Sequence, residues 1–148
     1  MILVRYPSIY RGYGSQAAGF YLAGGIYPWR EELIDLLKTS EAFFKAAIIN
    51  PIAPAYSPEI NTPWEFNNIR HSDCIVFWFS RDAVSPITLF EMGAGCRDHL
   101  KGMVVGVENG NPIRAEIVEQ LRLYRPGLRV AETLLELKEE MEKFLLHL

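Results

Sequence analysis

The sequence predicts an α/β protein in which a flavodoxin-like, doubly wound sheet of about five parallel strands carries helices on both faces. Three observations support this fold class. Short runs that are apolar at every position alternate with longer amphipathic stretches. Strands that are apolar on both faces are typical of a parallel sheet covered on both sides. Right-handed crossovers then leave few topologies, and 148 residues suit one domain spanning 1–148.

The first half of the chain supplies two of these strands. We expect the first strand at Phe20–Ala23, where the apolar run ends at two glycines, and a helix at Pro28–Lys38. Proline suits the first helical position because the N–H that it lacks would have no partner there. The second strand is expected at Ala46–Asn50, where a proline stops it.

The second half continues the alternation. A proline-rich loop leads into a helix expected at Trp64–His71, and the third strand follows at Cys74–Phe79. Ser85 and Pro86 then mark the start of a helix expected over Ile87–His99. The remaining expected elements are a strand at Met103–Val107, a helix at Ile113–Tyr124, a short strand at Leu128–Val130 and a last helix at Glu132–Leu148.

Both ends of the chain leave an alternative open. We expect Met1–Tyr6 to add an edge strand or a hairpin, and Pro7–Gly19 to form a loop. In the last helix, apolar side chains recur at alternating spacings of three and four residues, at Leu134, Leu137, Met141, Phe144 and Leu148. We interpret this pattern as packing on the sheet. A contact between two copies of the chain in a homo-oligomer is the less favoured interpretation.

The composition excludes several classes of function. Hydrophobic residues make up 49% of the chain and charged residues 22%, which is typical of a globular protein in water. The net charge of −3 provides no basic surface for nucleic acid. The sequence shows neither a leader pattern nor an apolar run long enough to cross a membrane. We therefore expect a cytoplasmic protein that binds neither nucleic acid nor membrane.

The sequence gives no sign of a cofactor or a metal site. It lacks the glycine spacings of dinucleotide-binding and P-loop motifs, and its three histidines share no ligand spacing. Cys74 and Cys96 fall in a predicted strand and a predicted helix, so we expect reduced, buried thiols. We expect the protein to work without a cofactor and without a metal.

Glu91 is the main candidate for chemistry. It falls in the second turn of the helix after Ser85, and its neighbours three and four residues away are small or apolar. That helix follows the third strand, and open α/β folds bind ligands near the carboxyl ends of their strands. A carboxylate in such surroundings is costly unless it has a task or a partner. Glu91 is therefore a nucleophile or general base, or else an ordinary carboxylate on a helix surface.

Other candidate binding residues lie at strand ends and helix starts. Gly24 and Gly25 would let a ligand approach the backbone, although a tight turn also explains them. Trp64 and Glu65 would line a pocket at the start of their helix, although an aromatic residue there also suits the core. Asp82 follows the third strand and would lie on the same rim.

Four segments, taken in order, carry a family resemblance: Phe20–Gly25, Trp64–Glu65, Ser72–Trp78 and Pro86–Gly93. Together they resemble the nucleoside 2-deoxyribosyltransferase-like family over well over half of the chain. The resemblance implies a flavodoxin-like fold and a ligand that consists of a base and a deoxyribose.

The resemblance also implies three catalytic roles. The Glu of the family's Glu-x-Gly segment is the nucleophile, which corresponds to Glu91. A Tyr on the first strand orients that Glu, which corresponds to Tyr21, and we expect its hydroxyl to hydrogen-bond the carboxylate. An Asp that recognises and protonates the base corresponds to Asp73. Position alone would place Asp73 at the amino end of the sheet, but we give the resemblance the greater weight.

The resemblance leaves the reaction itself open. Transferases of the family carry a second Asp where this chain has Ser85, and related deoxynucleoside 5′-monophosphate glycosidases bind phosphate through hydroxyls, a task that Ser85 and Thr88 would suit. The expected partner is a small-molecule nucleoside or nucleotide. The expected activity is that of a glycosyltransferase or a hydrolase with a covalent deoxyribosyl intermediate. The alternative is a non-catalytic nucleotide-binding module that retains the pocket.

Overall fold

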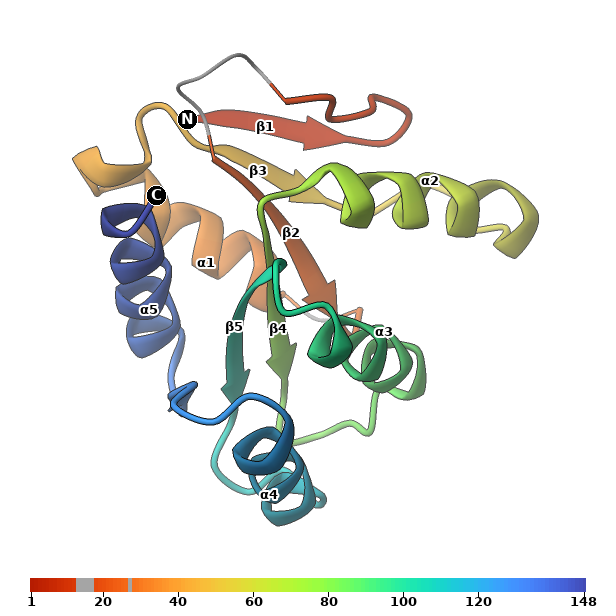
Figure 1. Ribbon diagram of the computed structural model, residues 1–148. Coiled ribbons are helices and arrows are strands. Elements are labelled where there is room, and N and C mark those ends of the chain that lie inside the picture. Colours follow the sequence, from red (N-terminus) through yellow and green to blue (C-terminus); the bar gives the residue numbers. More distant parts are fainter. Residues whose placement is uncertain (13–17, 27) are drawn as a thin grey trace.

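The computed structural model describes residues 1–12, 18–26 and 28–148, and its sheet has six strands that all run parallel (Figure 1). The strand order is β1-β3-β2-β4-β5-β6. The elements in chain order are β1 (Ile2–Arg5), β2 (Gly19–Gly24), α1 (Trp29–Lys38), the 3-10 helix η2 (Glu41–Phe43), β3 (Ala47–Asn50), α2 (Pro58–His71), β4 (Cys74–Phe79), α3 (Pro86–Arg97), β5 (Gly102–Val107), α4 (Arg114–Tyr124), β6 (Val130–Ala131) and α5 (Leu134–Leu146).

The predicted fold class is confirmed. Counted from β2, the strand order is that of flavodoxin-like doubly wound sheets. The sixth strand, β1, pairs in parallel with β3 at the edge of the sheet. Of the two expectations for the N-terminus, the edge strand is therefore correct and the hairpin is wrong, because hairpin strands run antiparallel. In β1, Val4 is buried and its neighbours Leu3 and Arg5 are exposed, as suits a strand with one covered face.

Helices cover both faces of the sheet (Figure 1). On one face lie α2, α3 and α4, which contribute Trp64, Met92 and Ile117 in turn to a core cluster. On the other face lie α1 and α5, which contribute Leu33, Leu137 and Met141 to a second cluster. The apolar stripe of the last helix thus packs on the sheet, as we expected. None of the helices in the described part of the chain is both long enough and apolar enough to span a bilayer.

α2 begins at Pro58 rather than at Trp64. The proline-rich sequence concealed this start, because Pro63 lies inside the helix. A proline in the second turn removes one intrahelical hydrogen bond, which the rest of the helix tolerates. The side-chain oxygen of Asn61 accepts the backbone N–H of Ser57 at 2.7 Å, which adds a hydrogen bond at the same end.

The loop expected before β2 falls partly on residues 13–17, which lie outside the described residues. The part before them is attached to α2. The indole N–H of Trp64 donates to the carbonyl of Ser8 at 2.8 Å, and the backbone N–H of Tyr10 donates to Oδ1 of Asn68 at 2.9 Å. Asn68 is fully buried, and its side-chain oxygen provides the acceptor for a backbone N–H of the loop that has no strand partner there.

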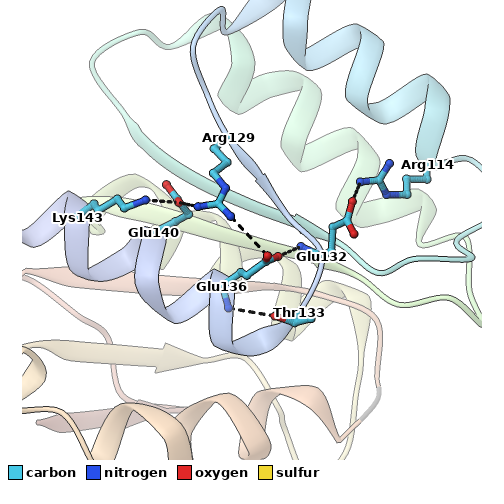
Figure 2. Close-up of polar contacts among 7 residues, drawn as sticks. All are labelled: Arg114, Arg129, Glu132, Thr133, Glu136, Glu140 and Lys143. Atoms are coloured by element: carbon cyan, nitrogen blue, oxygen red, sulfur yellow. Dashed lines mark hydrogen bonds and ion pairs between the residues drawn. The ribbon is translucent and has the colours of Figure 1, made fainter.

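α5 begins after a capped turn, shown in Figure 2. The hydroxyl of Thr133 accepts the backbone N–H of Glu136 at 3.2 Å, and the Glu136 carboxylate accepts the backbone N–H of Glu132 at 2.7 Å. The first bond satisfies an N–H group that the first turn of a helix leaves free, and the second attaches the residue before the N-cap to that turn. Arg129 pairs with the same Glu136 at 3.4 Å, but an exposed ion pair adds little. The cap therefore determines where the helix starts.

Candidate functional site

A groove of about 1010 Å³ lies between α2 and α3 and extends to the amino ends of β4 and β5, where Phe144 of α5 also lines it. Its walls include Phe66 from α2, Glu91 from α3 and Ile75 from β4. Asp73 and Lys101 line it toward the amino ends of the strands. The groove therefore contains two of the three residues expected to be catalytic, Glu91 and Asp73.

α3 presents Glu91 to this groove. The helix begins at Pro86 after the N-cap residue Ser85, as the sequence predicts. Gly95, one turn beyond Glu91, faces the sheet, and a Cβ built there would lie 3.6 Å from Cδ1 of Ile75. The small residue lets the helix pack closely on β4, so Glu91 is partly buried beside the sheet.

Glu91 shares its surroundings with a second carboxylate and a cation. Burial and the negative charge of Glu65 on α2 together raise the pKa of Glu91 to about 7, against the opposing charge of Arg30. Burial also raises the pKa of Glu65, and Arg30 again opposes this shift. Glu91 is thus close to half ionised at neutral pH, which suits a group whose protonation state is part of a reaction.

Tyr21 belongs to the same cluster. It is fully buried in the middle of β2, where it pairs with Ile49 and Ile75 on the neighbouring strands. Burial, and then the charges of Glu91 and Glu65, raise the pKa of Tyr21 well above its usual value, so the phenol is neutral at physiological pH. Among the described residues, no hydrogen bond joins the Tyr21 hydroxyl to Glu91. The charge of Glu91 thus disfavours ionisation of the Tyr21 phenol, and the expected hydrogen bond is not formed.

The pattern analysis did not identify Arg30. Its side chain is only 4% exposed, and its guanidinium donates to three backbone carbonyls: Nε to Leu22 at 3.2 Å, and the terminal nitrogens to Gly24 at 2.6 Å and Gly25 at 2.8 Å. Burial lowers the pKa of Arg30 to about 10, so it is cationic at neutral pH. Arg30 precedes the buried residues Leu33 and Leu37 of α1 by three and seven positions, and this helical spacing could have predicted its burial.

Asp73 lies at the amino end of the sheet, where its place before β4 alone would put it. Its Oδ2 accepts the backbone N–H of Gly19 at 2.6 Å and the hydroxyl of Tyr10 at 3.3 Å, which attaches the start of β2 to the preceding loop. The charge of Asp73 favours the protonated form of Lys101, whereas the charges that shift the pKa of Glu91 are those of Arg30 on α1 and Glu65 on α2. Both residues line the groove, but Asp73 stands outside the cluster around Glu91.

Packing accounts for Gly24, the first of the two glycines at the end of β2. A Cβ on Gly24 would lie 2.7 Å from the ring of Trp29 and 2.7 Å from the carbonyl oxygen of Trp78. The carbonyl of Gly25 accepts the indole N–H of Trp29 at 3.2 Å as well as a bond from Arg30. These contacts support the interpretation of the pair as a tight turn.

The other expected binding residues are spread more widely. Ser85 and Thr88 are buried at the start of α3. Asp82 is exposed and lines a second groove, of about 750 Å³, together with Trp78 and Glu108. Trp78 belongs to the core cluster of the α1 and α5 face, so this groove is distinct from the one that Glu91 lines. The structure therefore brings together Tyr21, Glu65 and Glu91 and leaves Asp82 apart from them.

The described residues contain no metal centre, because nowhere in 1–12, 18–26 and 28–148 do three His, Cys, Asp or Glu side chains gather closely enough to hold an ion. Cys74 and Cys96 are free and buried, as expected. Burial raises the pKa of both thiols, which keeps them protonated and unreactive.

The fold is that of a flavodoxin-like α/β protein, and the charged cluster around Glu91 is its candidate site. Residues 18–111 match the sequence profile of the nucleoside 2-deoxyribosyltransferase-like family. The match covers well over half of the chain, and the chain therefore belongs to this family. The matched segment includes β2 to β5 and every member of the cluster around Glu91. No curated protein matches the chain significantly.

Proposed function

We propose that this protein cleaves the N-glycosidic bond of a 2-deoxyribonucleoside, or of its 5′-monophosphate, through a covalent intermediate on Glu91. The observation that carries the proposal is the partly buried Glu91 carboxylate, which lines a groove within the family-matched segment and interacts with Glu65, Tyr21 and Arg30. A sugar carbon that loses its base passes through an oxocarbenium-like state, which an adjacent carboxylate stabilises.

The proposed reaction has two steps. In the first, an oxygen of ionised Glu91 bonds to C1′ while the C1′–N bond breaks, and the departing base takes that electron pair together with a proton from an acid. In the second, water or a second base attacks C1′ and gives up a proton to the conjugate base of that acid. The bond to Glu91 breaks as the new bond to C1′ forms, and its electron pair returns to the carboxylate. Attack by water gives hydrolysis, and attack by a base gives transfer.

We assign the proton transfer to Glu65 in preference to Asp73. The charge of Glu65 raises the pKa of Glu91, and the pKa of Glu65 is itself raised, so Glu65 can hold the proton that the leaving base needs. The carboxylate of Asp73 already accepts hydrogen bonds from Gly19 and Tyr10. An aryl deoxyriboside whose leaving group needs no protonation should restore activity to Glu65→Gln. Recovery in Asp73→Asn alone would return the role to Asp73, as the family resemblance implies.

Trapping the intermediate tests the central assignment. A 2′-fluoro nucleoside and its 5′-monophosphate, each with a reactive leaving group, should add the mass of one fluorodeoxyribosyl group to the intact protein. Peptide mapping should place that mass on Glu91. The Glu91→Gln variant should gain no mass, whereas Glu139→Gln, which changes an exposed carboxylate of α5, should be labelled as fast as the wild type.

The same experiment separates the enzyme from a binding module. Labelling at another residue, or full labelling of Glu91→Gln, would contradict the role of Glu91. Saturable binding of the unmodified nucleotide with neither adduct nor turnover would favour the non-catalytic module. The observation that supports this alternative is Ser85, which stands where transferases of the family carry a second Asp.

A further inference from the structure

Arg70, near the end of α2, differs from most arginines of the chain. The others mostly pair with a carboxylate or donate to backbone carbonyls. Within residues 1–12, 18–26 and 28–148, the guanidinium groups of Arg11, Arg70 and Arg97 have neither kind of partner. Of these, it is Arg70 that lines the groove with Glu91. The groove thus contains an arginine whose N–H donors are not used by the fold.

The position of the Arg70 side chain is defined by an aromatic ring. Phe66, Ile69 and Arg70 fall on one face of α2, and all three line the groove. The Arg70 guanidinium lies 5.7 Å from the centroid of the Phe66 ring. A ring face attracts a cation without using any of its N–H groups. The contact therefore holds the guanidinium on the groove wall and leaves its donors available to a ligand.

The other cations of the groove add positive charge beside Arg70. Lys101 donates to two carbonyls at the end of α2, at 3.0 and 3.2 Å, and Arg125 donates to two carbonyls between α3 and β5, at 2.9 and 2.8 Å. These acceptors are neutral, so both charges persist. The carboxylates in this part of the groove, Asp73 and Asp98, each accept a backbone N–H. Three cations thus line it with two carboxylates, in a chain whose net charge is −3.

We propose that Arg70 determines substrate specificity by binding the 5′-phosphate, so that the groove prefers a 2-deoxyribonucleoside 5′-monophosphate to the free nucleoside. This inference rests on the proposed role of Glu91. The phosphate is attached through C5′ to C4′, across the ring oxygen from C1′. A sugar whose C1′ meets Glu91 therefore carries its phosphate within the same groove. The planar guanidinium matches two phosphate oxygens with two parallel N–H groups.

The hydroxyls that the sequence suggested for this task lie elsewhere. Ser85 and Thr88 are buried at the start of α3, and neither of them lines the groove. A phosphate in the groove therefore needs a different partner, and Arg70 supplies both the charge and the donors.

The kinetic test compares each of the four 2′-deoxynucleoside 5′-monophosphates with its own nucleoside. In the wild type, the ratio of the two kcat/KM values should favour the nucleotide. In Arg70→Gln that ratio should fall about 10- to 100-fold, mainly through the KM of the nucleotide, because charge-assisted bonds to the phosphate are lost. Arg70→Lys, which keeps the charge without the fork, should give an intermediate ratio. Arg97→Gln, which removes an exposed arginine of α3 outside the groove, should keep the wild-type ratio.

A wild type that prefers the nucleoside, or a ratio that Arg70→Gln leaves unchanged, would overturn the proposal. Calorimetric binding separates this failure from a failure of the proposed function. Glu91→Gln, which should not turn over, should bind the nucleotide more tightly than the nucleoside and lose that preference when Arg70→Gln is added. The same preference in a wild type that forms neither adduct nor product would retain the phosphate site and refute the reaction. A labelled Glu91 with binding and kinetics indifferent to Arg70 would retain the reaction and refute the phosphate site.

Discussion

Replacing Glu91 by Gln should make the protein more stable at alkaline pH while it removes the proposed nucleophile. Burial disfavours the ionised carboxylate in the folded chain, and the pKa of Glu91 is raised from 4.5 to about 7. Below pH 4.5 both the folded and the unfolded chain hold the proton, so the wild type and Glu91→Gln should respond alike to pH. Between pH 4.5 and about pH 7 the unfolded chain has released the Glu91 proton while the folded chain still holds it, so the wild type loses stability as the pH rises. Above about pH 7 the loss is complete.

The structure sets the size of this effect. One pKa unit corresponds to about 1.4 kcal/mol, so the shift of Glu91 from 4.5 to about 7 has an upper limit of about 3.5 kcal/mol. Glu91 still contacts water at the groove, and a partly buried amide is also imperfectly solvated. We therefore expect Glu91→Gln to gain about 1–2 kcal/mol over the wild type between pH 4 and pH 8.

Urea unfolding of both proteins at pH 4, 5, 6, 7 and 8 measures this gain. Glu139→Gln, at an exposed position on α5, is the matched control and should show no such dependence on pH relative to the wild type. A difference between Glu91→Gln and the wild type that stays constant across this range would refute the argument, because it would mean that folding does not perturb the Glu91 carboxylate.

Three further predictions concern packing, chemistry and metal dependence. Gly24→Ala should destabilise the fold by about 2–4 kcal/mol in urea unfolding, since its Cβ would meet Trp29 and the Trp78 backbone at 2.7 Å. Gly93→Ala in α3, where a Cβ meets nothing within 4 Å, should instead stabilise the fold by about 0.5–1 kcal/mol. Equal effects of the two substitutions would contradict the packing argument. Tyr21→Phe should slow a single turnover several-fold with little change in binding, because it removes the phenol whose hydroxyl senses the charge of Glu91, and an unchanged rate would exclude Tyr21 from the chemistry. Turnover should be the same with and without a chelator, and a loss that a divalent ion restores would show that the reaction needs a metal.

Much of the fold could be predicted because its elements follow from local chemistry. The wholly apolar run of β4 and the Ser85–Pro86 start of α3 each identify an element without reference to the rest of the chain. The start of α2 could not be predicted in this way, because Pro63 resembles a loop residue until the fold shows that one missing N–H is tolerated. The partner of β1 is likewise a long-range choice: an edge strand and a hairpin have the same local pattern, and only the pairing with β3 decides between them.

The site was predictable only in part, for a similar reason. Glu91 could be placed because helix periodicity and the position after β4 suffice to bring it to the groove. Arg30 was missed because a charged residue near the start of a helix is normally solvated, and its burial depends on carbonyls that the turn after β2 presents. For Asp73, position predicted the amino end of the sheet correctly, while its role in the reaction stays a prediction from the family resemblance.

The family-matched segment ends at residue 111, before β6 and α5. The sheet face that carries Val76 and Val104 is covered by α5 through Leu137 and Met141. A fragment cut at the end of the match would leave these valines in water and would lose the contact between α1 and α5. The unit that folds is therefore larger than the unit that carries the family's sequence signature. Substitutions in α5 should be tolerated as long as one side of the helix stays apolar, so divergence can concentrate on its exposed side. Phe144 is the exception, because it lines the groove.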